Sequence, residues 1–486
     1  MKNKFFSNLI LILLLNVVIK PLYILGIDAE ILKITEYNNP GAYGTYFSLL
    51  NLTFIFNIIL DLGINNFNTR NIAQNNQLFT KHFSKIFTLK ITLSIIYLIV
   101  LIGVGYFLNY RFKELKWLFI IGVNQVLVAI ILYIRSNLSA LLQFKKDGLL
   151  SVADRLVLIL FCGYFIWGFN NSSVISIEFF IYSQTFAYLL TILIGLIFLF
   201  KHSSFPKLLL DPLFFKLIIK KSFPYALLIF LMSIYYYSDV VMVEKMLDNI
   251  EVVSYAHGYR FFLAVNMIGY LFAGLLLPIF SKLIKDQKSI QPISWLSFKT
   301  LFMIALIISV SIWSYKSQIL NWRYEITGFN LEHSSDTFGW LMISFIAVSC
   351  NYIFGTLLTA NGSLKSLNII AALGIFINIS LNLLLIPKWG SEGASFASAL
   401  TQFFILISQI FFSYKYFHFT FYLKSSLQII FSTAFLFSGA YIISHKSPLI
   451  WEYNLFMTFT FGIFIGVALK IFNWKELLKL FKASKP

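Results

Sequence analysis

Residues 177–200 read IEFFIYSQTFAYLLTILIGLIFLF, an apolar stretch whose one charged side chain is that of Glu178. A helix that crosses a bilayer needs about 20 mostly apolar residues, and lipid accepts only backbones whose hydrogen bonds are satisfied internally. Stretches of this kind fill most of the chain. The predicted spans are 5–27, 42–69, 87–108, 117–143, 148–169, 177–200, 217–246, 253–281, 294–315, 337–360, 366–387, 391–414, 421–443 and 449–470. The sequence therefore predicts an all-α integral membrane protein with fourteen transmembrane helices.

The composition of the 486-residue chain agrees with this prediction. Hydrophobic residues make up 59% and charged residues 12%, and the mean hydropathy is +0.80, which is outside the range of soluble domains. The net charge of +18 does not indicate nucleic-acid binding, because most of the 38 Lys and Arg residues fall in loops on one side of the predicted membrane. That asymmetry follows the positive-inside rule and predicts that both termini are cytoplasmic.

The loops leave no room for a soluble catalytic domain. The longest polar connection runs from about residue 316 to 336. We find no phosphate-binding loop, no zinc-protease motif and no dinucleotide-binding glycine pattern. Cys162 and Cys350 both lie in predicted spans, where a packing role is favoured over a disulfide or metal site. We therefore expect a protein that is not an enzyme and that uses no cofactor or metal.

An internal repeat is visible in the order of short segments. AYGTYF at 42–47 opens the second span and SYAHGY at 254–259 opens the eighth, while LLQ at 141–143 and LLTAN at 357–361 close the fourth and tenth. Six spans per repeat is an even number, so both copies enter the membrane in the same sense, as parallel repeats. The predicted parts are an N-terminal lobe at 1–201 (six spans), a C-terminal lobe at 202–415 (six spans), and two extra helices with a basic tail at 416–486.

The segment NISLNLLLIPKWGSEGA at 378–394 resembles the signature of the eleventh and twelfth spans of polysaccharide flippases. These are the Wzx-type transporters of O-antigen and exopolysaccharide in the MOP exporter superfamily. Three further segments resemble the family, namely DLG at 61–63, SDVVM at 238–242 and ANG at 360–362. The resemblance covers essentially the whole chain.

The resemblance implies a flippase that moves an isoprenoid-pyrophosphate-linked oligosaccharide across the cytoplasmic (inner) membrane by alternating access. Its partners would be that lipid-linked oligosaccharide, membrane lipids and other polysaccharide-assembly membrane proteins. One alternative is a multidrug and toxic-compound extrusion antiporter of the same superfamily. Such a pump for cationic drugs favours acidic cavity residues, whereas the embedded basic residues here match or outnumber the acidic ones. A membrane O-antigen polymerase or ligase is disfavoured by the short loops and the repeat.

The 378–394 signature also has a local physical interpretation. Pro387 cannot donate a backbone hydrogen bond and restricts the residue before it, so it is expected to end a span. Gly390 and Gly393 permit a tight turn into the next span. Asn378 and Asn382 are one helical turn apart and share a face. Their amides either bond between helices or contact the cargo.

Charged residues inside the spans are the remaining candidates, because a charge at the bilayer centre costs about 2.5–3.5 kcal/mol on insertion scales. Asp61 with Arg135, and Asp239 with Arg260, are expected at similar depths, as packing pairs or as parts of a cavity. Arg155, beside Asp154, is expected to reach toward the interface. Cations would offset the charge of a pyrophosphate. The predicted substrate-binding residues are Lys20, Arg135, Arg260, Asp61, Tyr236, Tyr237, Asn378 and Asn382, and the predicted ion-coupling residues are Asp239 and His257.

Overall fold

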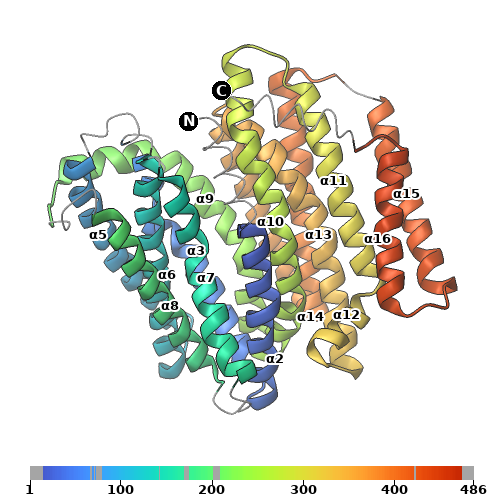
Figure 1. Cartoon of the computed structure of the whole chain (residues 1–486), viewed down its shortest axis with the longest axis horizontal. Helices are drawn as coiled ribbons and strands as arrows, with labels where there is room; N and C mark the ends of the chain where they lie inside the picture. The colour runs from blue at the N-terminus through green and yellow to red at the C-terminus, as the bar shows by residue number, and fades with distance from the viewer. Residues whose placement is uncertain are drawn as a thin grey trace. The chain divides into compact units, whose positions relative to one another are not determined.

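The computed structural model describes residues 15–65, 68–69, 72, 79–141, 143–168, 175–200, 208–420 and 423–472. These residues form helices and connecting turns and contain no strand, so the predicted all-α class is confirmed (Figure 1). The start of the predicted span 5–27, the predicted basic tail beyond residue 472 and parts of several predicted loops lie outside the described residues.

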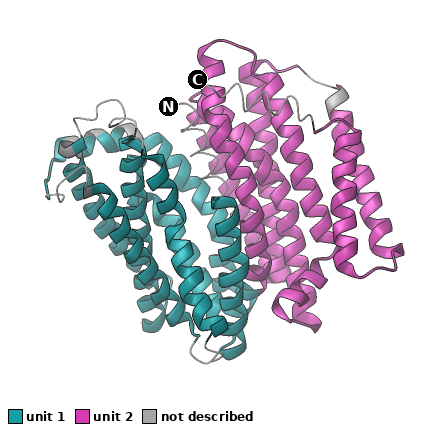
Figure 2. Cartoon of the chain, in the orientation of Figure 1, with its two compact units in different colours: residues 1–253 teal, residues 254–486 magenta. Residues whose placement is uncertain are grey.

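The chain divides into two compact units, Met1–Val253 and Ser254–Pro486 (Figure 2). In unit 1, α9 packs against α3, and both α6 and α7 pack against α8. The elements of unit 1 are η1 (Tyr23–Asp28), α2 (Ala29–Asn38), α3 (Ala42–Phe56), η2 (Asn57–Leu60), α5 (Phe79–Phe107), α6 (Phe112–Ala140), α7 (Phe144–Gly163), η4 (Tyr164–Gly168), α8 (Ile177–Phe200) and α9 (Pro212–Met246).

Helix α10 (Asn249–Lys285) begins in unit 1 and continues into unit 2. Within unit 2, α13 packs against both α11 and α14, and α11 also contacts the C-terminal hairpin of α15 and α16. The other elements of unit 2 are α11 (Gln291–Ser314), α12 (Lys316–Tyr324), α13 (Gly328–Ala360), α14 (Leu364–Phe417), α15 (Leu423–Lys446) and α16 (Trp451–Ala468). The predicted lobe boundaries near residues 201 and 415 stay predictions.

Eleven helices of the described residues are long and apolar enough to cross a membrane. The protein is therefore a multi-pass membrane protein. The predicted count of fourteen spans is not decided by these eleven, because α14 is a single element of 54 residues with an internal break.

The break in α14 lies in the 378–394 signature. Gly390 has φ 59° and ψ −136°, a conformation that only glycine adopts readily. A Cβ on Gly393 would lie 2.5 Å from the carbonyl oxygen of Leu385, so the chain folds back closely on itself here. The predicted roles of both glycines are confirmed. Helical assignment continues past Pro387 as far as the break, so the proline precedes the turn without ending the helix itself.

Two predicted boundaries are wrong. The polar connection at 316–336 is largely helical, since α12 lies within it and α13 begins at Gly328. The predicted span 42–69 is not one continuous helix. After α3 it narrows to a 3-10 turn, and Leu62 (φ 47°) and Gly63 (φ 79°) are in left-handed conformations.

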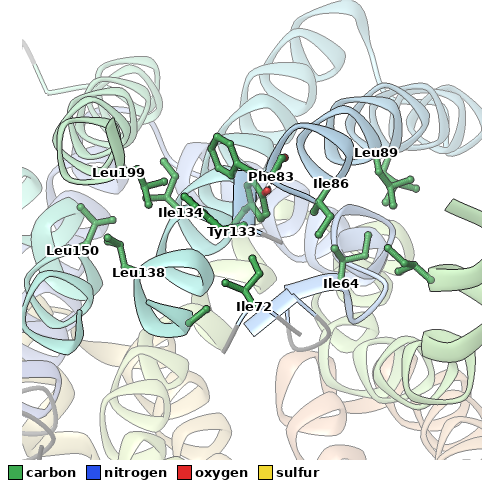
Figure 3. Packing of buried hydrophobic residues seen from close by; sticks show 14 residues of the cluster. Ile64, Ile72, Phe83, Ile86, Leu89, Tyr133, Ile134, Leu138, Leu150 and Leu199 are labelled. Atoms are coloured by element: carbon green, nitrogen blue, oxygen red, sulfur yellow. Dashed lines mark hydrogen bonds between the residues drawn. The ribbon is translucent and has the colours of Figure 1, made fainter. Parts of the chain in front are cut away.

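Unit 1 is held together by apolar side chains from several helices. Phe83, Ile86 and Leu89 of α5 belong to one buried cluster with Tyr133, Ile134 and Leu138 of α6, and Leu150 of α7 and Leu199 of α8 complete it (Figure 3). The rings of Phe83 and Tyr133 stack with centroids 5.7 Å apart. In unit 2, an equivalent cluster joins α10, α11, α13 and α14. These clusters fix the positions of the helices that carry the polar residues described below.

Candidate functional site

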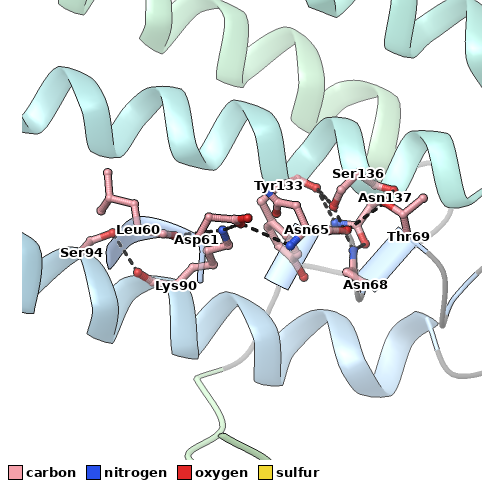
Figure 4. A network of polar contacts seen from close by, with 10 residues as sticks. All are labelled: Leu60, Asp61, Asn65, Asn68, Thr69, Lys90, Ser94, Tyr133, Ser136 and Asn137. Atoms are coloured by element: carbon pink, nitrogen blue, oxygen red, sulfur yellow. Dashed lines mark hydrogen bonds and ion pairs between the residues drawn. The ribbon is translucent and has the colours of Figure 1, made fainter. Parts of the chain in front are cut away.

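The break after α3 creates the first polar site. A helix end leaves carbonyl oxygens without intrahelical partners, and here Lys90 of α5 reaches the carbonyl oxygen of Leu60 over 3.0 Å. The same ammonium forms an ion pair with Asp61. The Lys90 side chain is 3% exposed and that of Asp61 is 31% exposed. Figure 4 shows the two side chains pointing toward each other.

Polar contacts continue from Asp61 toward α6 (Figure 4). The Asn65 backbone N–H donates to Asp61 over 3.2 Å. Asn68 donates to Ser136 Oγ over 3.0 Å and to Asn137 Oδ1 over 2.9 Å. This network fixes the segment after the break against α6.

The predicted pairing of Asp61 with Arg135 is wrong. Asp61 pairs with Lys90, while Arg135 Nε donates to Asp147 Oδ1 over 2.7 Å. The physical reason is the break itself, because it turns Asp61 toward α5 and presents an unpaired carbonyl that a lysine can satisfy. Arg135 instead reaches the acidic residue in the first turn of α7.

Three basic residues of unit 1 lie near one another, on three different helical segments. Lys20, in the helical segment at 15–22, is within electrostatic range of Arg155, Arg135 and Asp154. No ion pair to Lys20 occurs among the described residues, whereas Arg135 pairs with Asp147 and Arg155 lies 3.7 Å from Asp154. Besides burial, the charges of Arg155, Arg135 and Asp154 act on Lys20. We call Lys20, Arg135 and Arg155 the basic cluster.

Aromatic hydroxyls flank the basic cluster. The Arg155 guanidinium lies 4.6 Å from the Tyr23 ring centroid and donates to the Tyr188 hydroxyl over 3.5 Å. The predicted reach of Arg155 toward the interface stays a prediction. Nearby, the Tyr43 hydroxyl donates to Asp28 over 2.7 Å. Ring faces and hydroxyls beside cations suit a ligand that carries both phosphate and sugar.

Helix α9 carries the predicted tyrosines. The Tyr236 ring lies 5.0 Å from that of Tyr235 and 6.4 Å from that of Tyr237. Tyr237 also contacts Phe54 of α3, with centroids 5.1 Å apart. Tyr236 and Tyr237 are half-buried and Asp239 is fully buried.

The same helix carries a carboxylate that is not among the predicted site residues. Glu244 accepts hydrogen bonds from Ser48 of α3 over 2.7 Å and from Tyr110 over 2.5 Å. Lys245 contributes an ammonium 3.5 Å from Glu244 and 3.4 Å from the Tyr110 ring centroid. Burial and the neighbouring carboxylate raise the pKa of Tyr110. The adjacency of Glu244 and Lys245 near a span end made both resemble ordinary interfacial charges.

In unit 2, His257 has partners of its own. Its Nδ1 lies 3.2 Å from Ser334 Oγ, and its ring centroid lies 4.5 Å from that of Tyr324 in α12. Arg260, on the same helix, is buried. Asp239 belongs to unit 1 and both His257 and Arg260 to unit 2. Their predicted association, and the ion-coupling role of Asp239 and His257, stay predictions.

Asn378 and Asn382 are both fully buried in α14. Asn382 Nδ2 donates to Asn378 Oδ1 over 3.2 Å, so the two amides share a face as predicted. Whether they serve helix packing or cargo stays open. Among the residues that the structure describes, no group of three or more His, Cys, Asp or Glu side chains could hold a metal ion.

Residues 34–284 match the family described as "Polysaccharide biosynthesis protein". No curated protein sequence matches the chain significantly. Among solved structures, the lipid II flippase MurJ in an inward closed conformation aligns with a TM-score of 0.71 and 16% identity, over 94% of this chain and 97% of that one.

Two transporters of the MOP superfamily also align. An inward-facing multidrug resistance MATE family transporter gives a TM-score of 0.62 at 12% identity, over 86% of this chain and 94% of its own. A transporter from Pyrococcus furiosus, described by the reverse polarity of its binding pocket, gives 0.52 at 12% identity, over 88% and 96%. At such identities these alignments show a shared fold.

Proposed function

Because the chain belongs to the polysaccharide biosynthesis protein family, we propose that it is a flippase for an isoprenoid-pyrophosphate-linked oligosaccharide. It would act in the cytoplasmic membrane, with both termini cytoplasmic, fourteen spans and two six-helix lobes that alternate access to a central cavity. Other polysaccharide-assembly membrane proteins would supply and consume its cargo. The fold shared with a lipid II flippase supports a lipid-linked cargo.

The basic cluster is the observation that carries the proposal. A pyrophosphate needs compensating charge wherever it leaves water, and charge-assisted hydrogen bonds from Lys and Arg provide it. Lys20 is suited to this role because it is half-buried and has two arginines within electrostatic range. Tyr23 and Tyr188 beside Arg155 add ring faces and hydroxyls for the first sugar. Arg260, Asp61, Tyr236, Tyr237, Asn378 and Asn382 stay candidate substrate contacts.

The competing function is extrusion of toxic compounds, which the fold of the MATE family transporters favours. The fold cannot choose between them, since one structural neighbour is described by a pocket of reverse polarity. The charge at the site separates the two functions. A cavity for cationic drugs gains from carboxylates, whereas in the described part of the chain Lys20 is the member of the basic cluster without an ion-pair partner, since Arg135 pairs with Asp147 and Arg155 with Asp154.

The test begins with deletion of the gene, after which we expect a lipid-linked glycan to accumulate on the cytoplasmic face. Complementation then uses Lys20→Gln, Lys20→Arg and Arg155→Gln, with Lys288→Gln as a matched charge loss at an exposed position. Surface glycan per folded protein should fall at least tenfold in the two cluster Gln variants and be partly kept by Lys20→Arg. Wild-type display in both cluster Gln variants would refute the assignment of the basic cluster. Drug sensitivity without glycan accumulation would favour the extrusion pump.

A further inference from the structure

Two adjoining cavities lie at the end of unit 1 where α2 ends and where α6 and α8 begin. The larger measures about 250 Å³, and the side chains around it include those of Asn38, Asn39, Trp117 and Glu178. The smaller measures about 110 Å³ and shares Trp117 and Glu178 with the first. In the predicted orientation this end of the unit faces away from the cytoplasm. None of these residues is among the predicted site residues.

The larger cavity has the chemistry of a sugar site. Its polar groups are two amides, the hydroxyls of Thr35 and Ser176 and a carboxylate, all of which exchange hydrogen bonds with hydroxyl groups. The amides of Asn38 and Asn39 are exposed. Trp117 adds an aromatic wall, and none of the described residues that line this cavity is basic. Its volume is sufficient for one sugar ring.

The smaller cavity has the chemistry of a phosphate next to a lipid tail. It is lined by Lys113, Lys116 and Glu178 at its polar end and by Ile120, Ile181 and Tyr182 at its apolar end. Lys113, Trp117 and Ile120 follow one face of α6 at the spacing i, i+4, i+7. Lys113 is held 5.0 Å from the Trp117 ring centroid and 3.6 Å from Glu178. Lys116 has no ion-pair partner in the described part of the chain.

The surface beyond this apolar end can receive a hydrocarbon chain. Phe119 of α6 is 47% exposed, and Tyr182 and Phe186 of α8 are each 49% exposed. On helices that span a membrane, such side chains face lipid. Lysine and aromatic side chains alone would be the ordinary belt of a membrane interface. That belt does not account for a cavity lined by amides, hydroxyls and a carboxylate directly beside the lysines.

We propose that the two cavities form an external binding site for the headgroup of a lipid-linked sugar. The sugar next to the phosphate occupies the larger cavity, the phosphate lies at Lys113 and Lys116, and the lipid tail follows the exposed apolar faces of α6 and α8. The site is distinct from the basic cluster, and its ligand class rests on the proposed function. It would hold the cargo after translocation, before the next reaction of glycan assembly removes it.

The test is photo-crosslinking in the living cell with the full-length chain. p-Azidophenylalanine replaces Asn39 in the larger cavity or Tyr182 in the smaller one, and mass spectrometry identifies the lipid on the purified protein. Tyr106, an aromatic residue that is 75% exposed on α5, is the matched control position. We expect lipid adducts that carry an isoprenoid and sugar at both cavity positions and only phospholipid at Tyr106.

Charge variants test whether the two lysines bind the phosphate. Lys113→Gln with Lys116→Gln should reduce the glycolipid adduct at Tyr182 at least fivefold, whereas Lys288→Gln should not change it. Phospholipid adducts alone, or no lipid adduct, at the two cavity positions would overturn the proposal. The two proposals can fail separately. If deletion of the gene causes no glycan accumulation, but glycolipid adducts form when the protein is expressed, the flippase function is refuted and the external binding site is retained.

Discussion

Lys90 is the most buried cation among the described residues of unit 1. Its contacts explain the backbone conformation at the end of α3. Its ammonium satisfies both the carboxylate of Asp61 and the carbonyl oxygen of Leu60. If α3 continued as a regular helix, the carbonyl oxygen of Leu60 would instead accept a hydrogen bond from the backbone N–H four residues further on. Buried ionic groups of this kind are strongly destabilising when one partner is removed, because the other is left uncompensated.

We predict that Lys90→Met lowers the free energy of unfolding by about 3 kcal/mol, near the lower end of the range for a broken buried pair because Asp61 is partly exposed. The double variant Lys90→Met with Asp61→Asn should recover about half of this loss, since the uncompensated carboxylate is then gone. Thermal unfolding of the purified protein in one detergent measures both. Strictly additive effects of the two substitutions would contradict the ion pair as the cause.

The matched control for this prediction is Lys85→Met. Lys85 lies on the same helix and pairs with Asp211 over 2.5 Å, but both side chains are more than a fifth exposed. Water screens such a pair, so its removal should cost about 0–1 kcal/mol. An equal loss of unfolding free energy in Lys85→Met and Lys90→Met would show that the burial of the ion pair does not determine the loss.

At the scale of elements, the contact of α3 with α9 and the start of α10 is the closest helix packing around the candidate site. A Cβ placed on Gly44 would lie 2.0 Å from the carbonyl oxygen of Asn249. Four residues further along α3, Ser48 donates to Glu244. The carboxylate also binds Tyr110 in the turn between α5 and α6. Three segments are thereby joined at one end of unit 1.

Gly44→Ala should therefore push α3 away from Asn249 and lower the melting temperature by several degrees, corresponding to about 1–3 kcal/mol for an overpacked contact. Gly103→Ala is the control, because a Cβ on Gly103 meets nothing within 4 Å. Alanine is the better helix former by about 1 kcal/mol, so this variant should be neutral or slightly more stable. A Gly44→Ala variant as stable as wild type would mean that the close approach does not constrain the helices.

The same elements show what the sequence could predict. Hydropathy located the helices because every segment that crosses lipid must be helical and mostly apolar, whichever apolar residues it contains. The turn in α14 was predictable from Gly390 and Gly393, since its cause is local. The pairing of Asp61 with Lys90 was not, because it depends on where α3 breaks and on which helix then lies opposite. Leu62 and Gly63, which follow Asp61 directly, carried the only local sign of that break.

For the whole molecule, orientation is the property on which the proposed transport direction depends. The excess of Lys and Arg in one set of loops predicts which ends of the helices face the cytoplasm. By that rule the turns after α2 and α9 are external, and the connections after α10 and α14 are cytoplasmic. The roles proposed for the external headgroup site and for the basic cluster depend on this assignment.

Single-cysteine labelling tests the orientation, in a chain from which Cys162 and Cys350 have been removed. Both cysteines are buried, so conservative replacement by Ala or Ser should preserve the fold. Cysteines at the exposed positions Tyr37 and Asp248 should react with a membrane-impermeant maleimide on intact cells. Cysteines at Lys288 and Lys415, which are also exposed, should react only after permeabilisation. Because all four positions are accessible in the folded chain, failure to react reports the membrane and not burial. Labelling of cysteines at Lys288 or Lys415 on intact cells would show that the orientation is the reverse of the predicted one. The cavities at Asn39 and Trp117 would then face the cytoplasm, and the site there would bind the cargo before translocation instead of after it.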